Sequence, residues 1–289
     1  MTLVQLITRF DPWQSSLCTC PPKLTLNPYT GCSHNCVYCY ATSYTAHFAE
    51  CHPKKDLLKR VESEARKLNG ETVSISNSSD PYPHSEVELG LTRECLQILS
   101  GNNCKVQLIT KSSLVARDAD IITKMPCMVA LTITTQDEEI ARLIEPGAPS
   151  PSERLKAIET LVSKNIPVSA RIDPVIPSVN DNPTLLIATL ADIGVKHVTS
   201  STYKVKRDNW QRFFKAMPSV AEKIKSLYFS KGERVGGSTL LPVDLRLNIL
   251  TRIRSSVVSN GMKFGVCREN LKHLNTAPCD GSWLLQNQR

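Results

Sequence analysis

The sequence has no run of about 20 consecutive apolar residues, the length that a membrane-spanning helix requires. Its first residues, MTLVQLITRFDPW, lack the basic leader and long apolar segment of a secretory signal. Internal repeats and low-complexity tracts are missing too. These absences predict a globular protein of the cytoplasm with no membrane partner.

The cysteine content does not fit a disulfide framework. Eleven cysteines are an odd number, and 289 residues are far more than a small disulfide-stapled domain needs. Hydrophobic residues make up 41% and charged residues 21%, which is ordinary for a globular chain that can bury a large core. Metal ligation is therefore the better interpretation of the cysteines.

Acidic residues are scarce in the last third of the chain. Residues 196–289 contain 17 Lys and Arg against 6 Asp and Glu, so this third carries more than the whole net charge of +8. Its segment 203–210, YKVKRDNW, mixes cations with aromatic residues, as nucleic-acid contacts do. The pattern suggests a nucleic-acid partner. The alternative is a solvated helical face, with Asp208 as a helix cap and Trp210 in the core.

Short β-type runs alternate with amphipathic helical patterns along the chain. The β runs cover 23–26, 72–76, 105–110, 128–134, 167–172, 197–201 and 263–267. The helical patterns cover 55–68, 87–99, 116–124, 152–164, 183–193, 208–227 and 242–259, with a break at Pro218.

This alternation predicts right-handed βα units around a parallel sheet. The length holds about six such units, fewer than the eight of a closed barrel. We therefore predict an α/β fold, a partial (β/α)6 TIM-type barrel. Residues 1–25 form an N-terminal segment and residues 26–240 the barrel core. Residues 241–289 supply a helix, the last strand and a cysteine-containing tail packed on the barrel.

Three cysteines lie in one short loop after the first β run. Cys32, Cys36 and Cys39 form a C-x3-C-x2-C pattern within the segment NPYTGCSHNCVYCY. Three thiolates so close together can bind three irons of a 4Fe-4S cluster and leave the fourth iron open. Zinc would need a fourth ligand such as His34, and this unequal spacing is uncommon for zinc. The triplet favours an iron-sulfur cluster.

With an aromatic residue directly before its last cysteine, the triplet resembles the signature of the radical S-adenosylmethionine (SAM) superfamily. The phrase NPYTGCSHNCVYCYA resembles, more narrowly, the branch of spore photoproduct lyase and the DNA repair photolyase-like proteins. Further matching segments are SNSSDPY at 76–82, TKS at 110–112, RD at 117–118, EPGAPS at 145–150, Arg154, DPVIP at 173–177 and CDGS at 279–282.

The resemblance implies that the open iron takes SAM, whose reductive cleavage yields a 5′-deoxyadenosyl radical that abstracts hydrogen. It implies an electron donor such as ferredoxin or flavodoxin. By the same resemblance Tyr38 lies against the adenine, Ser79 bonds the methionyl or ribose part, and Lys111 meets the SAM carboxylate. We expect Arg171 in the barrel mouth as a further cofactor-binding residue, near Glu145. The alternatives are that Tyr38 is a core tyrosine, that Ser79 caps a turn before Pro81, and that Glu145 and Arg171 form a structural ion pair.

One position departs from this branch. Spore photoproduct lyase returns a hydrogen atom from a cysteine, and the resembling position here, two residues before Ser79, is Asn77. Asparagine has no S–H bond to donate, so the lyase's own reaction is doubtful for this chain. A second metal site or the missing hydrogen donor is expected among four other cysteines, Cys18, Cys20, Cys267 and Cys279, with scattered core or surface thiols as the alternative.

Three functions are consistent with these features. The first is a radical SAM enzyme that repairs or modifies a nucleic-acid base. The second is a radical SAM enzyme that modifies a protein or a small metabolite, as the missing cysteine suggests. The third is a zinc-stabilised nucleic-acid-binding module in which the triplet is structural.

Overall fold

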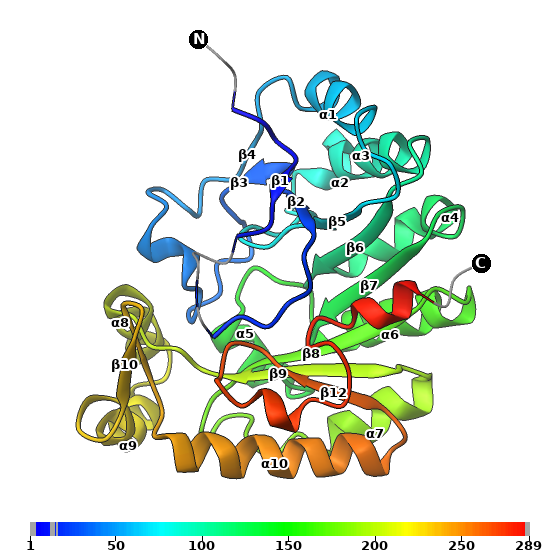
Figure 1. Ribbon diagram of the computed structural model, residues 1–289. Helices are drawn as coiled ribbons and strands as arrows, with labels where there is room; N and C mark the ends of the chain where they lie inside the picture. Colours follow the sequence, from blue (N-terminus) through cyan, green and yellow to red (C-terminus); the bar gives the residue numbers. More distant parts are fainter. Residues whose placement is uncertain (1–3, 12–14, 16, 287–289) are drawn as a thin grey trace.

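The computed structural model describes residues 4–11, 15 and 17–286 (Figure 1). Its centre is an eight-stranded sheet in which the first strand is antiparallel and the others are parallel. The strand order is β1 (Thr8–Arg9), β2 (Leu24–Leu26), β5 (Thr72–Ile75), β6 (Lys105–Thr110), β7 (Cys127–Thr132), β8 (Val168–Val175), β9 (His197–Thr202) and β12 (Lys263–Val266).

Helices cover the outer side of this sheet, from α1 at the top of Figure 1 to α10 at the bottom. They are α1 (Leu57–Ala65), α2 (Glu86–Leu89), α3 (Leu91–Ser100), α4 (Ala119–Ile122), α5 (Glu138–Ile144), α6 (Pro151–Ser163), α7 (Thr184–Ile193), α8 (Arg207–Ala216), α9 (Pro218–Phe229) and α10 (Val243–Ser259). Two small hairpins complete the fold, β3 (Tyr29–Thr30) with β4 (His52–Pro53) and β10 (Glu233–Val235) with β11 (Ser238–Leu240).

Local sequence explains where several helices begin and end. In α6, Ser150 and Glu153 form a capping box around Pro151, which satisfies backbone N–H groups that have no partner inside the helix. Asp137 caps α5 by accepting from two backbone N–H groups of its first turn. Gly194 ends α7 at φ +106°, a conformation that glycine adopts without steric cost.

Side chains alternate between the two faces of every long parallel strand. In β8, Val168, Ala170 and Ile172 join the main core beneath the helices, so Ser169 and Arg171 face the concave side. The same alternation holds in β6, β7, β9 and β12, whose concave positions include Gln107, Thr132, Thr199 and Gly265. The concave face is therefore largely polar, unlike the apolar interior of a closed barrel.

The C-terminal tail fills part of this concave face (Figure 1, red). The Thr199 hydroxyl donates to the backbone oxygen of Cys279 at 2.7 Å, and the Gln107 amide donates to that of Asp280 at 2.7 Å. A Cβ atom on Gly265 would lie 2.5 Å from the Cα of Cys279, so only glycine leaves room for the tail. The last short turn, η4 (Ser282–Leu285), forms a small apolar cluster with β7. The open part of the concave face lies toward the C-terminal ends of the strands.

The structure confirms the predicted α/β partial barrel, with β12 adding a seventh parallel strand beside β9. The pattern at 87–99 is wrong as one helix, because Gly90 at φ +61° separates α2 from α3. The pattern at 116–124 is a 3-10 turn, η2 (Ser113–Asp118), followed by the short α4. Helix α5 was not predicted. The proposed division at residues 25 and 240 stays a prediction.

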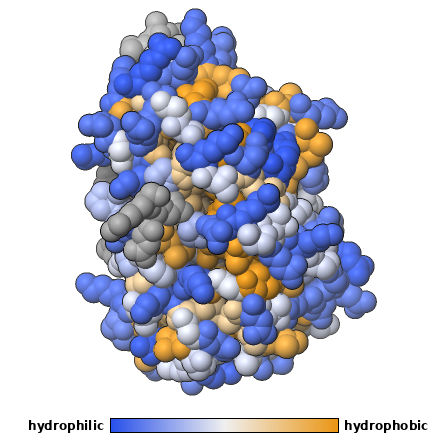
Figure 2. Space-filling model, turned by 90° about the vertical axis from the view of Figure 1, so that its right-hand side faces the viewer, coloured by the Kyte–Doolittle hydropathy of each residue, from blue (hydrophilic) through white to orange (hydrophobic). Residues whose placement is uncertain are grey.

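The surface agrees with a globular chain. Figure 2 shows a mostly hydrophilic face on which apolar side chains form small patches. None of the helices in the described ranges has the length and apolar character to cross a bilayer.

Candidate active site

The cysteine triplet lies in a loop that leaves the C-terminal end of β2, here called the triplet loop (residues 27–41). Its path depends on Gly31, which has φ +81°. A Cβ atom there would lie 2.3 Å from the backbone oxygen of Glu50, so any other residue would force the loop apart. From the other side, Gly147 donates its N–H to the His34 oxygen at 3.0 Å, and its own missing Cβ leaves space for Ser33.

The three thiols are held in a protected position. Cys36 is buried, whereas Cys32 and Cys39 are partly accessible. Burial raises the pKa of Cys32 to about 12, and the nearby negative charge of Asp80 adds to the effect. Burial also raises the pKa of Cys36, although the positive charge of Lys111 opposes this. A bound cation would favour the thiolate forms that burial disfavours.

A buried ion pair supports the triplet loop from below. Arg154 and Glu145 meet at 2.6 Å with side chains 1% and 0% exposed, and the Tyr38 hydroxyl donates to the other Glu145 oxygen. Burial alone would raise the pKa of Glu145, but the charges of Arg154 and Lys111 lower it. Tyr38 is buried, and the Lys111 ammonium lies 5.5 Å from the centre of its ring. Its hydroxyl thus has a structural partner, and a role against adenine stays a prediction.

Lys111 follows the end of β6 and points toward the triplet. Burial lowers its pKa, but the negative charges of Cys36 and Glu145 outweigh that effect and raise it. Its backbone N–H donates to Asp80 at 2.7 Å, and the Thr110 hydroxyl donates to the same carboxylate at 2.7 Å. Asp80 keeps a pKa lowered to about 2 despite burial, because His34 at 3.4 Å and these donors stabilise its charge. Lys111 is therefore a fixed cation beside the triplet.

The two polar residues after β5 both contact loop segments in this structure. The Ser79 hydroxyl donates to the Tyr29 oxygen at 3.0 Å, so it braces the triplet loop. Its predicted bond to SAM stays a prediction, and the turn before Pro81 is made by Asp80. The Asn77 amide donates to the Thr25 hydroxyl at 2.6 Å across to β2.

Arg171 lies inside the barrel mouth, as predicted, where it pairs with Asp173 two residues further along β8. It also bonds the thiol of Cys267, which follows β12 on the same face as Gly265. Burial lowers the pKa of Arg171, and the charges of Asp173 and Cys267 raise it by more. Cys267 is therefore the one of the four cysteines that lies beside Arg171. Its role as hydrogen donor and the cofactor-binding role of Arg171 stay predictions.

Helix α8 holds the triplet loop through its backbone, a contact that the sequence did not predict. The Arg212 guanidinium donates to the Cys36 oxygen at 2.6 Å and the Cys39 oxygen at 2.8 Å. The Asn209 amide donates to the Tyr38 oxygen at 3.1 Å. Asp208 accepts from hydroxyls in turn η1 (Ala41–Ser43) rather than capping its own helix.

Trp210 packs among aromatic side chains of α8 and α9, as predicted for a core residue.

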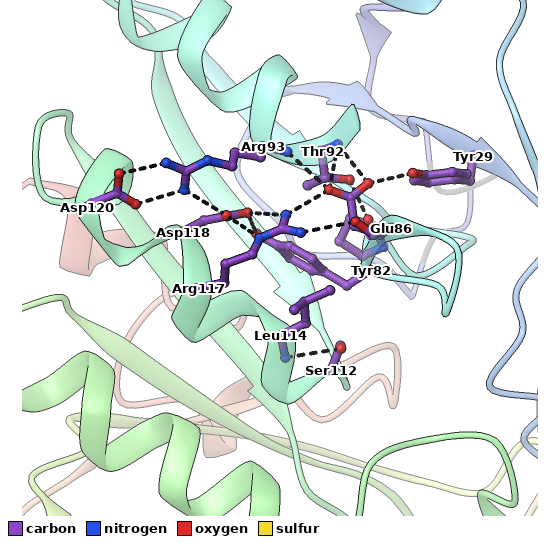
Figure 3. A network of polar contacts seen from close by, with 11 residues as sticks. Tyr29, Tyr82, Glu86, Thr92, Arg93, Ser112, Leu114, Arg117, Asp118 and Asp120 are labelled. Atoms are coloured by element: carbon purple, nitrogen blue, oxygen red, sulfur yellow. Dashed lines mark hydrogen bonds and ion pairs between the residues drawn. The ribbon is translucent and has the colours of Figure 1, made fainter. Parts of the chain in front are cut away.

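A second buried network anchors the start of the triplet loop (Figure 3). Tyr29 donates to Glu86, whose carboxylate also pairs with Arg117 at 2.9 Å. Arg117 and Arg93 both reach Asp118, at 2.8 and 3.0 Å. Because Glu86 and Asp118 have fully buried side chains, the two arginines are needed to satisfy their charges. The Arg117–Asp118 pair noted in the sequence is therefore part of the scaffold that supports the loop.

The described residues contain no group of three or more His, Cys, Asp or Glu that could hold a single metal ion. A structural zinc site needs its ligands around one ion, and the zinc-stabilised module stays an alternative. A cubane cluster instead spreads its cysteines over different irons. The thiols of Cys32 and Cys39 are close enough to raise the pKa of Cys36, and Lys111 from the end of β6 brings a positive charge beside them. The chemistry of these residues fits an iron-sulfur cluster.

The remaining cysteines separate into two sets. Cys95, Cys104 and Cys127 are buried packing residues, and Cys51 is partly accessible. Cys20 and Cys279 face each other with their sulfur atoms 3.8 Å apart, and Cys18 bonds Cys20. A second metal site or a hydrogen donor among Cys18, Cys20, Cys267 and Cys279 stays a prediction.

A family model described as the radical SAM superfamily matches residues 26–191, more than half of the chain. The chain therefore belongs to the radical SAM superfamily, whose enzymes use a 4Fe-4S cluster and SAM. Among similar sequences, the uncharacterized protein Rv2578c of Mycobacterium tuberculosis is 27% identical over 198 residues, covering 63% of this chain and 58% of the relative. The uncharacterized protein MJ0683 of Methanocaldococcus jannaschii is 31% identical over 166 residues, covering 55% and 62%. The chain thus spans less than two thirds of the length of these relatives.

Solved structures agree on the fold. Spore photoproduct lyase complexed with dinucleoside spore photoproduct has a TM-score of 0.63 at 12% identity, covering 84% of this chain and 75% of the lyase. SuiB of Streptococcus suis bound to SAM has a TM-score of 0.55 at 12% identity, covering 84% and 51%. These likenesses confirm the predicted radical SAM architecture.

Proposed function

We propose that this radical SAM enzyme repairs or modifies a base in nucleic acid, using a 4Fe-4S cluster bound by Cys32, Cys36 and Cys39. When bound, the cluster and SAM supply a 5′-deoxyadenosyl radical that takes a hydrogen atom from the substrate. The family match over residues 26–191 carries the radical SAM part of this proposal. The spore photoproduct lyase fold and the basic C-terminal third support the nucleic-acid part.

The chain's own residues perform the supporting steps. Lys111 provides a positive charge for the SAM carboxylate, and the Glu145–Arg154 pair keeps that lysine and Tyr38 in place. Burial shields Cys36 from water, and Cys32 and Cys39 remain partly accessible. Cys267 is the thiol available to return a hydrogen atom in the barrel mouth, where Asn77 has none to give.

The nucleic acid would approach along the side formed by α8 and the β10–β11 hairpin. An open groove of about 430 Å³ lies there, lined by Lys206 and Arg207 and by Thr42 and Ser43 of η1. Not all of the C-terminal cations are free for phosphates, since Lys204 and Arg246 pair with the buried Glu269. Exposed cations remain on this side at Arg207 and Lys215.

Asn77 favours a second candidate, a radical SAM enzyme that modifies a protein or small metabolite, because the lyase's own donor position is lost. Substrate deuteration separates the two. Cluster-loaded protein is incubated anoxically with SAM, dithionite and fully deuterated DNA or RNA. The proposal predicts 5′-deoxyadenosine that carries deuterium from the nucleic acid. Deoxyadenosine without deuterium, together with no binding of either polymer, would favour the second candidate.

Binding is tested separately by fluorescence anisotropy with single-stranded DNA and RNA at two salt concentrations. Each phosphate contact adds about 0.9 to the salt slope on duplex DNA and about 0.7 on single strands. Arg207→Glu with Lys215→Glu should weaken binding at least tenfold and flatten the slope. Arg252→Glu with Lys263→Glu is the matched control, because these two exposed cations lie on α10 and at the start of β12. Equal loss in both variants would show that only net charge matters.

Ferredoxin or flavodoxin as the electron donor and a cytoplasmic location remain predictions from the sequence.

A further inference from the structure

A group of three thiols lies away from the triplet, here called the second thiol group (Cys18, Cys20 and Cys279). It joins the segment before β2 to the C-terminal tail on the concave face. The sulfur atoms of Cys20 and Cys279 are 3.8 Å apart. The Thr19 hydroxyl donates to the Cys279 sulfur at 3.5 Å, and Cys18 bonds Cys20.

The surroundings fix these thiols in register. Next to Cys279, Asp280 pairs with Lys23 at 2.6 Å, with both side chains under 5% exposed. The Lys23 ammonium also donates to Gln107 at 2.7 Å. Together with the Thr199 bond to the Cys279 backbone, these contacts hold the tail against the segment that carries Cys20. Two sulfurs held this close need only a short approach to reach the bond length of about 2.05 Å.

The two sulfurs differ in accessibility and in charge. Cys279 is 2% exposed, whereas Cys18 and Cys20 are partly accessible. The hydrogen bond from Cys20 lowers the pKa of Cys279, and the Thr19 hydroxyl lowers it further. The bond to Cys18 lowers the pKa of Cys20, but the pairing with Cys279 and burial raise it to about 12. Ionisation is therefore favoured at the buried Cys279 sulfur over Cys20, and Cys18 and Cys20 are partly accessible to solvent.

We propose that Cys20 and Cys279 form a redox-active dithiol that closes to a disulfide by exchange with a small disulfide such as oxidised glutathione. Cys20 attacks oxidised glutathione, one glutathione thiolate leaves, and a mixed disulfide forms on the accessible sulfur. The Cys279 thiolate then attacks the Cys20 sulfur and releases the second glutathione. The two protein thiols lose two protons and two electrons, and one oxidised glutathione becomes two reduced molecules.

The bond would tie the segment before β2 covalently to the tail that fills the concave face. Both contact the strands that position the active site, yet neither contributes a triplet cysteine. This role is independent of the proposed substrate and of cluster binding, so either can fail without the other.

Peptide mapping tests the pairing in the full-length, cluster-loaded protein under anoxic conditions. The protein is equilibrated with glutathione mixtures of increasing oxidised fraction, for hours because the first attack is slow at neutral pH. It is then quenched with acid, alkylated and digested with trypsin without reduction. Cys18 and Cys20 fall in the tryptic peptide 10–23, and Cys279 falls in the peptide 273–289. The proposal predicts that these two peptides become linked as the oxidised fraction rises and separate again with dithiothreitol.

Single-residue variants show which cysteines form the disulfide. Cys18→Ser should keep it, Cys20→Ser should abolish it, and Cys104→Ser, at a buried thiol elsewhere, should leave it unchanged. Iron content and circular dichroism check that each variant is folded. Three results would each overturn the proposal: both peptides alkylated at every glutathione ratio, a stable glutathione adduct that never resolves, or a link that persists in Cys20→Ser.

Discussion

Replacing Glu145 by Gln should destabilise the folded chain strongly, although the two side chains have nearly the same size. The substitution keeps the shape of the side chain but removes the charge that faces Arg154 at 2.6 Å, where both side chains are at most 1% exposed. Breaking such a buried pair from one side costs about 3–5 kcal/mol, because the remaining charge is left uncompensated. We expect Glu145→Gln to lower the free energy of unfolding by about that amount.

Urea denaturation followed by tryptophan fluorescence measures this loss in anoxic protein. With a denaturant slope of about 2–3 kcal/mol per molar, the midpoint should fall by about 1 M or more. Arg154→Met should cost a similar amount. The double variant should cost clearly less than the two single losses together, since it leaves no unpaired charge.

The dependence on pH gives the sign of the effect. The pKa of Glu145 is lowered in the folded chain by Arg154 and Lys111, although burial opposes this. Its stabilising contribution is therefore complete above the unfolded value of about 4.3 and declines as the pH falls below it. The difference in the free energy of unfolding between wild type and Glu145→Gln should shrink in that acid range. A single-variant loss under about 1 kcal/mol at pH 7, or strict additivity, would refute the reasoning.

Two further predictions concern the triplet loop itself. Arg212→Ala removes two hydrogen-bond donors to the cysteine carbonyls of the loop. Since the side chain is 29% exposed, we expect the free energy of unfolding to fall by about 2 kcal/mol and iron to be released faster to a chelator. Lys215→Ala on the same helix should change neither quantity. Gly31→Ala should reduce iron incorporation and stability by about 2–3 kcal/mol, because its Cβ would meet the Glu50 oxygen at 2.3 Å. Gly70→Ala is the control with a similar φ of +80° and no atom within 4 Å; equal losses in the two glycine variants would contradict the proposed clash.

The sequence predicted the parts of this molecule that depend on local patterns. Short β-type runs identified the parallel strands to within three residues, and the alternation of β and α segments was enough to predict the partial barrel. The triplet could be interpreted because its spacing alone carries chemical meaning. Lys111 was placed near the mouth because residues that follow parallel strands meet at one edge of the sheet, whereas Arg171 lies within β8 itself.

What escaped prediction depends on contacts between distant segments. Arg212 reaches the triplet loop from 173 residues further along the chain, and a basic residue on an amphipathic helix gives no local sign of such a role. The partnership of Cys20 with Cys279 joins the two ends of the chain. Gly90 divides α2 from α3 by a left-handed turn, although the apolar spacing on both sides continues unbroken. The sequence spacing of these residues does not indicate which of them come into contact in the fold.

The most direct test of the central claim is reductive cleavage of SAM by the anoxically loaded protein. With about four irons per chain and dithionite as reductant, the account predicts 5′-deoxyadenosine from wild type and none from Cys36→Ala. Wild-type protein that contains a full complement of iron and sulfide, yet yields no deoxyadenosine, would contradict it.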